Sequence, residues 1–301
     1  MKDNAERASN GSRLIVYNVE DFLSLDLPPR ELIVDPIIPT QGVTMLYSKR
    51  GVGKTFVALT IAVGTAAGTN VFNWKIPKPR KVLYVDGEMS PQTMQERHKG
   101  IIKGVGKDFP SDNLKIYCAA IQDSCFLNLS DEKDQKALEF ILDGVDLLIL
   151  DNLSTLTEVK ENDADSWLSI QKWLIRLRQK NVSVLLIHHA GKSGQQRGTS
   201  RKEDILDCVV TLKSSREDDA QGAEFEVQYE KCRGFVGVKP FKAKLISDEE
   251  GKFTWSVSEY DLTKKIKEML DFGMTQRDIA SELGISQSRV CRLKNGAVRD
   301  R

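Results

Sequence analysis

The sequence predicts an α/β fold with a central, mostly parallel β-sheet, followed by a small all-α unit at the C-terminal end. Three observations lead to this prediction. A glycine-rich loop at residues 48–55 separates an apolar strand from a helical stretch, two later apolar strands lead into acidic residues, and residues 261–301 carry short helical patterns punctuated by glycines. Apolar strands that alternate with helical segments are typical of a parallel sheet with helices on its faces.

The length and charge set broad limits. The chain has 301 residues, with 44 Lys and Arg against 43 Asp and Glu. It can hold one large α/β domain and a small accessory unit, and any basic surface must be local. The five cysteines form no Cys-x-x-Cys pair, no apolar leader opens the chain, and no apolar stretch approaches the ~18 residues of a membrane span. We therefore expect reduced thiols, a cytoplasmic location and no membrane contact.

The loop at residues 48–55 is typical of a phosphate-binding loop. Its glycines let main-chain amides converge on a polyphosphate at the start of the next helix. Lys54 is expected to reach the terminal phosphates, and the Thr55 hydroxyl to hold Mg²⁺. Ser48 stands where the usual pattern begins with Gly, and the alternative interpretation is a chance glycine loop. The residues predicted to bind nucleotide are Lys49, Arg50, Gly51, Val52, Gly53, Lys54, Thr55 and Phe56.

Two later strands bring acids to the same edge of the predicted sheet. Residues 81–85 form a β-branched and aromatic run that leads to Glu88, a candidate to orient and deprotonate an attacking water. The alternative is a solvated loop acid. The apolar run 144–150 ends in Asp151, which fits the acid on the Mg²⁺ side of a phosphoryl-transfer site. Its alternative is an Asp that caps the following turn.

The next predicted strand, residues 182–187, ends in His188 and His189. Adjacent strand residues face opposite ways, so at most one of these histidines can face a shared site. The following loop, residues 190–202, is rich in Gly, Ser and Gln, and we predict that it either contacts DNA or is an ordinary solvated surface loop. Its basic residues are Lys192, Arg197, Arg201 and Lys202.

Residues 223–233 alternate cleanly between apolar and acidic or amide side chains, which predicts a half-buried strand. In this pattern Lys231 and Arg233 continue the apolar face, so two cations lie side by side at the strand end. They require an anionic partner, either a carboxylate of the same chain or a phosphate held by a neighbouring subunit.

The tail at residues 261–301 has the pattern of a helix-turn-helix unit, with a small apolar core and glycines between the helices. Its last helix carries side chains suited to base edges and phosphates of duplex DNA. The alternative is a helical hairpin that docks on protein. The residues predicted to contact DNA are Gln287, Ser288, Arg289, Arg292 and Lys294.

On the stretches 51–55, 84–89 and 148–152, the chain resembles the RecA-like ATPases of the RepA type, which are plasmid and phage relatives of the DnaB replicative helicases. The likeness spans about residues 33–255. It implies a RecA-like P-loop core that self-associates into a ring, usually a hexamer, with ATP and Mg²⁺ at subunit boundaries. The C-terminal helix-turn-helix is a departure, because the simplest members lack one.

The resemblance also implies roles for single residues. Lys54 and Thr55 match the phosphate-loop lysine and the Mg²⁺ hydroxyl, Glu88 the catalytic glutamate, and Asp151 the acid of the second Mg²⁺ motif. His188 falls where the family senses the γ-phosphate, with His189 as the fallback. The stretch from Arg197 flanks the family's second DNA loop, and Lys231 and Arg233 match a segment that reaches the ATP of the adjacent subunit.

These expectations combine into one functional hypothesis and two alternatives. We expect an N-terminal extension (1–32), a RecA-like ATPase domain (33–258) and a helix-turn-helix domain (261–301). The hypothesis is a ring-forming ATPase that moves on DNA, binding single strands with its core loops and duplex with its tail, as a helicase of a mobile element would. The alternatives are a sequence-specific DNA-binding regulator that uses the ATPase core as an assembly switch, and a nucleotide-dependent protein scaffold.

Overall fold

The computed structural model describes residues 15–27, 29–106, 108–123, 126–158, 164–191, 204–214, 223–234, 238–283 and 285–295. By its contacts the chain divides into two compact units, Met1–Glu31 and Leu32–Arg301. In the first unit, Asn18 caps the short helix α1 (Val19–Leu23) by accepting the Asp21 N–H at 2.8 Å.

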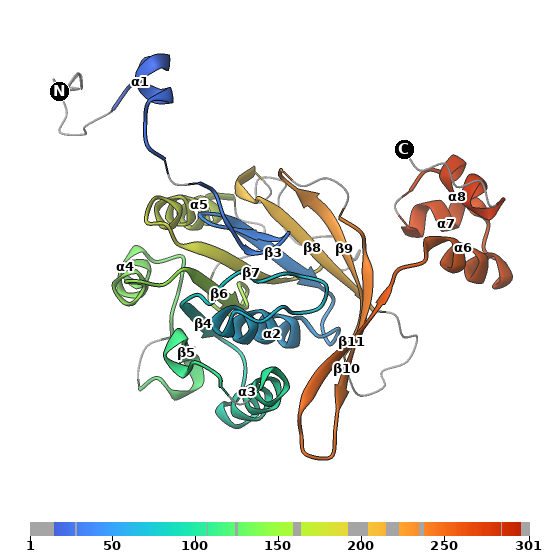
Figure 1. Cartoon of the computed structure of the whole chain (residues 1–301), viewed down its shortest axis with the longest axis horizontal. Coiled ribbons are helices and arrows are strands. Elements are labelled where there is room, and N and C mark those ends of the chain that lie inside the picture. Colours follow the sequence, from blue (N-terminus) through green and yellow to red (C-terminus); the bar gives the residue numbers. More distant parts are fainter. Residues whose placement is uncertain are drawn as a thin grey trace. The chain divides into compact units, whose positions relative to one another are not determined.

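The second unit is built on one large sheet. Nine strands within the described residues pair in the order β11-β10-β9-β8-β3-β7-β6-β4-β5 (Figure 1). The stretch from β8 to β5 is parallel, and β9, β10 and β11 join it antiparallel. The strands are β3 (Val43–Ser48), β4 (Val82–Asp86), β5 (Leu114–Cys118), β6 (Leu147–Asp151), β7 (Ser183–His189), β8 (Cys208–Ser214), β9 (Glu224–Cys232), β10 (Phe241–Ser247) and β11 (Phe253–Glu259). A separate ribbon pairs β1 (Leu32–Val34) with β2 (Ile38–Pro39).

Helices cover both faces of this sheet (Figure 1). Helices α2 (Lys54–Ala67) and α3 (Pro91–Val105) pack on one face, and α4 (Glu132–Ile141) and α5 (Ala164–Gln179) on the other. Short 3-10 turns at Ser111–Asn113 and Ala119–Ile121 flank β5. Strands β3, β4 and β6 are buried along their whole length because both faces are covered, which explains their near-continuous apolar sequences. The α/β fold with a mostly parallel sheet is confirmed, and it is that of a RecA-like P-loop core.

Three short helices follow the sheet: α6 (Leu262–Asp271), α7 (Gln276–Leu283) and α8 (Gln287–Lys294). They surround a small apolar core of their own, formed by Ile266, Ile279, Ala280 and Val290. Asp261 caps α6 and Ser286 caps α8 by accepting main-chain N–H groups. The Lys265 amine of α6 binds the buried carboxylate of Glu226 on β9, which fastens the first turn of α6 to the sheet.

Candidate active site

The carboxyl ends of the central parallel strands meet at one edge of the sheet. In the strand register, Ser48 of β3 is the partner of His189 of β7, and Asp86 of β4 is the partner of Asp151 of β6. Open α/β sheets place their ligands at this edge. The residues that the sequence singled out on separate strands therefore belong to one neighbourhood.

The phosphate loop joins the end of β3 to the start of α2. Gly51 and Gly53 have φ angles of +80° and +119°, which L side chains rarely adopt. A Cβ atom on Gly53 would also lie 2.7 Å from the Ala223 Cβ, whereas open space surrounds Gly51. Ser48, by contrast, is the last residue of β3 and shares its strand conformation. The loop therefore requires no glycine at position 48.

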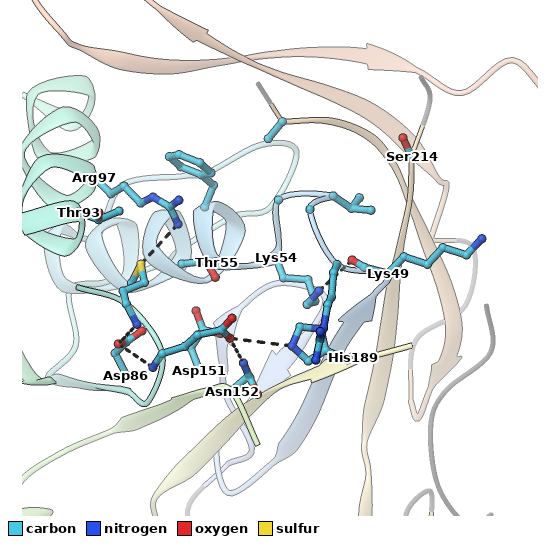
Figure 2. A pocket seen from close by; sticks show the side chains of 18 of the residues that line it. Lys49, Lys54, Thr55, Asp86, Thr93, Arg97, Asp151, Asn152, His189 and Ser214 are labelled. Atoms are coloured by element: carbon cyan, nitrogen blue, oxygen red, sulfur yellow. Dashed lines mark hydrogen bonds and ion pairs between the residues drawn. The ribbon is translucent and has the colours of Figure 1, made fainter. Parts of the chain in front are cut away.

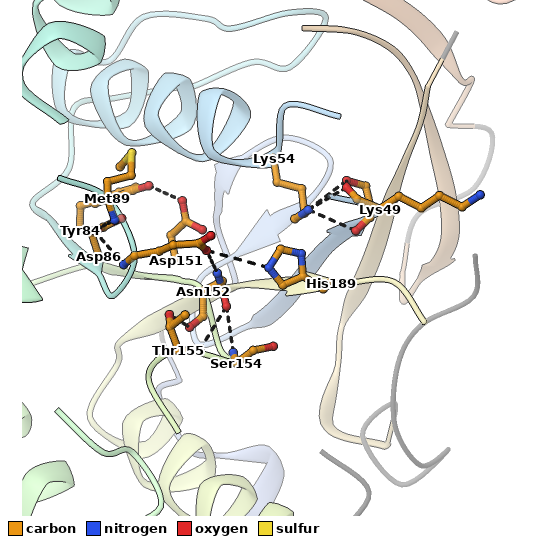
Figure 3. Close-up of polar contacts among 12 residues, drawn as sticks. Lys49, Lys54, Tyr84, Asp86, Met89, Asp151, Asn152, Ser154, Thr155 and His189 are labelled. Atoms are coloured by element: carbon orange, nitrogen blue, oxygen red, sulfur yellow. Dashed lines mark hydrogen bonds and ion pairs between the residues drawn. The ribbon is translucent and has the colours of Figure 1, made fainter. Parts of the chain in front are cut away.

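Lys54 contacts the loop to which it belongs. Its Nζ donates to the carbonyl oxygens of Ser48 and Lys49 at 3.2 and 3.0 Å, and to the Ser48 Oγ at 3.3 Å (Figure 3). Burial lowers the pKa of Lys54 to about 8, against the opposing attraction of Asp151 and Glu88. A buried amine at the mouth of a phosphate loop is placed to exchange these carbonyls for phosphate oxygens.

Asp151 lies at the end of β6 and is held by Tyr84. The Tyr84 hydroxyl donates to the Asp151 Oδ2 at 2.6 Å. Burial raises the pKa of Asp151, while hydrogen bonds from Tyr84 and Thr55 and the charge of Lys54 lower it. Burial, reinforced by Asp151, also raises the pKa of Tyr84, so its hydroxyl stays protonated and remains a donor.

The donor set suits Mg²⁺. Magnesium in phosphoryl-transfer sites is held by one or two protein oxygens, with the remaining positions taken by phosphate and water. The Thr55 hydroxyl and the buried Asp151 carboxylate supply such oxygens, and the two side chains are hydrogen-bonded to one another. These two residues would hold the ion.

Glu88 follows β4 in a tight turn that Asp86 stabilises. The Asp86 Oδ2 accepts the N–H groups of Glu88 and Met89 at 3.1 and 2.8 Å. The Glu88 carboxylate accepts a hydrogen bond from the Asn152 Nδ2, and its Oε2 lies 4.0 Å from the His189 Nε2 (Figure 3). The Glu88 side chain is 60% exposed, so it can contact a water molecule while the hydrogen bond from Asn152 holds its carboxylate in place.

All eight predicted nucleotide-binding residues line one cavity of about 830 Å³, together with Glu88 and Asp151. Figure 2 shows Thr93 and Arg97 of α3 at one end of this cavity and Lys49 at the other, with Thr55, Lys54 and Asp151 between them. The Arg97 guanidinium stacks over the Phe56 ring, 4.5 Å from its centroid. The cavity is thus continuous from the loop to the stacked pair of Phe56 on α2 and Arg97 on α3.

The structure brings His189, and not His188, to this cavity. His188 is buried and belongs to the register of Tyr47, on the sheet face that α5 covers. His189 lies on the opposite face, where α2 begins, and lines the cavity. The placement predicted for His188 is therefore wrong, because strand parity turns its side chain away, and His189, the fallback residue, is the histidine that lines the cavity.

A bulge at Glu230 changes the predicted faces of β9. Tyr229 and Lys231 pair with consecutive residues of β8, so Glu230 is an extra residue. One inserted residue turns the side chains that follow to the other face of the sheet. Cys232 consequently joins the core contacted by Tyr229. The prediction that Lys231 and Arg233 continue the face of Tyr229 is wrong for this reason.

Lys231 and Arg233 are not brought to the cavity of their own chain. Among the described residues that line it, neither is present. The Arg233 Nη2 donates to the Asp204 carbonyl oxygen at 2.9 Å, and its N–H donates to the Asp207 carbonyl oxygen at 2.8 Å. Both cations thus lie at the far end of β9 from Glu224, which does line the cavity.

The residues predicted to contact DNA fall into two groups. The basic loop residues Lys192, Arg197, Arg201 and Lys202 lie outside the described residues. On α8, the five predicted residues are all exposed, while Val290 points into the small core. The helical periodicity therefore separated the buried from the exposed face of α8 correctly.

Three residues of the site escaped the sequence reasoning. Asn152 binds Glu88, Tyr84 binds Asp151, and Arg97 stacks on Phe56. The first two had a usable signal, because Asn152 directly follows Asp151 and Tyr84 lies on the strand that leads to Glu88. Arg97 had none, since its place depends on the packing of α3 against α2.

The fold and this cavity define a P-loop nucleotidase. A family model described as an AAA domain matches residues 11–195, and the chain belongs to this family of P-loop ATPases. The matched stretch includes the phosphate loop, Glu88, Asp151 and both histidines, and it ends before β8. No curated protein matches the chain. Within the described ranges, no helix combines the length and apolarity that crossing a membrane requires.

Proposed function

We propose that the protein is a ring-forming RecA-like DNA motor, a replicative helicase or helicase-like ATPase of a plasmid or phage. The observation that carries this proposal is the division of the charged groups. One chain provides the phosphate loop, Glu88 and Asp151 around a single cavity, while Lys231 and Arg233 lie away from it. A second copy is needed to bring such cations to the phosphates.

In the proposed reaction, the residues of the cavity have separate roles. Lys54 leaves the loop carbonyls and binds the β and γ oxygens of ATP. Glu88, positioned by Asn152, orients a water molecule and takes its proton, and His189 lies beside Glu88 to respond to the γ-phosphate. Mg²⁺ held by Thr55 and Asp151 would neutralise phosphate charge when bound.

Lys231 and Arg233 are proposed to complete this site in the neighbouring subunit of a hexameric ring. An arginine supplied in this way contributes ~10³- to 10⁵-fold in rate to related phosphoryl transfers. The segment that bears them follows a bulged strand and ends at Gly234, whose φ of +83° turns the chain at once. Arg233 is exposed at this end of β9, and Lys231 is partly exposed.

The proposed DNA contacts are a single strand bound by the loops inside the ring and a duplex bound by the C-terminal helices. Support for the second contact comes from α8, where three cations, Arg289, Arg292 and Lys294, are exposed on a helix with a buried opposite face. An exposed basic helix suits phosphates and base edges in the major groove.

The test is ATP hydrolysis by purified protein with and without single-stranded DNA, beside the Lys54→Ala variant. Strong stimulation that disappears in the variant is the expected result, and strand-displacement assays then establish unwinding. A rate of hydrolysis that single-stranded DNA does not change would contradict the proposed DNA motor.

The second candidate is a sequence-specific DNA-binding regulator in which the ATPase core switches assembly, and α8 is the observation that favours it. Salt-dependent preference for one duplex site, without stimulation by single strands, would decide in its favour. A nucleotide-dependent scaffold predicts no DNA affinity at all.

A further inference from the structure

Two cysteine side chains meet across β8 and β9. Cys208 begins β8 and Cys232 ends β9, and the two residues are direct partners in the antiparallel register. Their Sγ atoms lie 3.2 Å apart. A disulfide requires a separation of about 2.05 Å, so a small rotation of the side chains suffices to bring the sulfurs together.

The backbone between these residues is also suited to a bond. The Arg233 N–H donates to the Asp207 carbonyl oxygen at 2.8 Å, so the ladder hydrogen bond lies beside the Cys208 and Cys232 pair and does not join it. Residues paired in this way have Cα atoms about 4.5 Å apart, within the ~4.4 to 6.8 Å range that disulfides span. Bond formation therefore needs no movement of either strand.

The two thiols differ in a way that favours a defined order of reaction. Cys208 is fully buried in the core, whereas Cys232 is half-buried and reachable from solvent. The hydrogen bond between the two thiols lowers the pKa of Cys232, and the same bond together with burial raises the pKa of Cys208. Cys232 is thus the nucleophile, and Cys208 resolves the intermediate.

We propose that Cys208 and Cys232 form a reversible disulfide site that a small disulfide such as oxidised glutathione closes. The Cys232 thiolate attacks one sulfur of glutathione disulfide and releases a glutathione thiolate. The Cys208 sulfur then attacks the Cys232 Sγ, its proton passes to the second glutathione as that leaves, and the protein disulfide remains. Two protein thiols are oxidised and one glutathione disulfide is reduced to two glutathione thiols.

The disulfide is expected to affect ATP turnover because of where the two cysteines lie, and this expectation rests on the proposed function. Cys232 stands between Lys231 and Arg233, the two cations proposed to reach the neighbouring subunit. The disulfide ties this segment to β8, whose next residues are buried in the sheet. Closing the bond therefore restrains the segment and is expected to lower turnover without lowering nucleotide affinity.

The experiment treats the full-length protein with oxidised glutathione and maps its thiols by peptide mass spectrometry after denaturation. A peptide linking Cys208 to Cys232, which disappears on reduction with dithiothreitol, is the expected product. Cys208→Ala should instead stop at a mixed disulfide on Cys232, and Cys232→Ser should leave Cys208 unreacted. Cys291→Ser, which removes an exposed cysteine on α8, is the matched control and should still form the link.

Glutathionylation of Cys118, Cys125 or Cys291 with no link between Cys208 and Cys232 would overturn the site. Turnover is measured on the same samples, where we expect a reversible loss of at least about tenfold with wild type and none with Cys232→Ser, which takes up no glutathione at this site. If the link forms and turnover is unchanged, control of the ATPase is refuted while the disulfide site stands. Loss of turnover in reduced Arg233→Ala, measured in parallel, tests the proposed function separately.

Discussion

Asn152 offers the sharpest test of how the site positions Glu88. Its Nδ2 donates to the Glu88 carboxylate, and its Oδ1 accepts the N–H groups of Ser154 and Thr155 at 3.0 and 3.2 Å. A neutral hydrogen bond contributes about 1 kcal/mol to the free energy of unfolding, so Asn152→Ala should lose about 2 kcal/mol from the two loop bonds. The bond to Glu88 adds little stability, because that side chain is 60% exposed.

Asn152→Asp removes the donor to Glu88 and keeps the acceptor. The aspartate retains an oxygen for the two N–H groups, but position 152 is buried, so the variant also buries a carboxylate beside Asp151 and should lower the free energy of unfolding. It has no donor for Glu88 and adds a like charge beside it, so the glutamate moves from its place. A displacement of this kind costs about 10²-fold in rate. Both variants should therefore lose kcat by about 10²-fold, and both should lose stability.

The assay is steady-state ATP hydrolysis with saturating Mg²⁺ and DNA, together with urea unfolding of each variant. Glu88→Gln is the companion variant, and adding Asn152→Asp to it should cost nothing further, because the group that Asn152 positions is already lost. Asn152→Asp with kcat within about threefold of wild type would refute the positioning role, since a threefold change is well below the effect of misplacement.

Four further perturbations test the site. Burial lowers the pKa of Lys54 to about 8, so the amine is charged below that pH and loses its charge above it. Nucleotide affinity measured by fluorescence titration should therefore weaken as pH rises through 8, and an affinity that does not change with pH would contradict this. Gly53→Ala introduces both a strained φ and a close contact with the Ala223 side chain, so it should weaken nucleotide binding at least about tenfold. Gly51→Ala adds only backbone strain of about 1 to 2 kcal/mol, because open space surrounds that position, and should weaken binding clearly less. Burial raises the pKa of Asp86 to about 6, so the folded state binds more protons than the unfolded state between about pH 4 and 6, and the free energy of unfolding falls as pH rises through that window. In urea unfolding at several pH values, Asp86→Asn should remove on the order of 2 kcal/mol of this fall. An unchanged dependence of the free energy of unfolding on pH would argue against it. Arg233→Ala should abolish turnover with nucleotide binding intact, and mixing it with Lys54→Ala protomers should restore activity in a ring that shares its sites; no recovery would count against completion in trans.

The phosphate loop could be predicted from sequence because its geometry is local. The positive φ angles at residues 51 and 53 favour the glycines found there, and Lys54 and Thr55 are the first two residues of the helix that follows. The acids at the strand ends could also be placed, since parallel strands end at one edge of the sheet. Even Ser48, the departure from the usual pattern, fits because its position belongs to the strand and not to the turn.

Features that depend on strand register could not be predicted. The choice between His188 and His189 requires knowing which sheet face carries α2, and alternation along one strand does not give that information. The bulge at Glu230 was missed as well, because the apolar alternation of β9 ends at Tyr229 and leaves no pattern that fixes the faces of Lys231 and Arg233. The meeting of Cys208 with Cys232 follows from the pairing of β8 with β9, which no local pattern encodes.

The contacts of Lys54 with its own loop also hold its amine in place at the phosphate loop. The amine is already surrounded by two carbonyl oxygens and a hydroxyl, so an incoming ligand must compete with three acceptors that are held in place. These acceptors are neutral, whereas a phosphate oxygen carries negative charge and forms a stronger hydrogen bond with an ammonium group. A phosphate that enters the loop can therefore draw the amine away from Ser48 and Lys49, and the lysine is held close to its ligand before the ligand arrives.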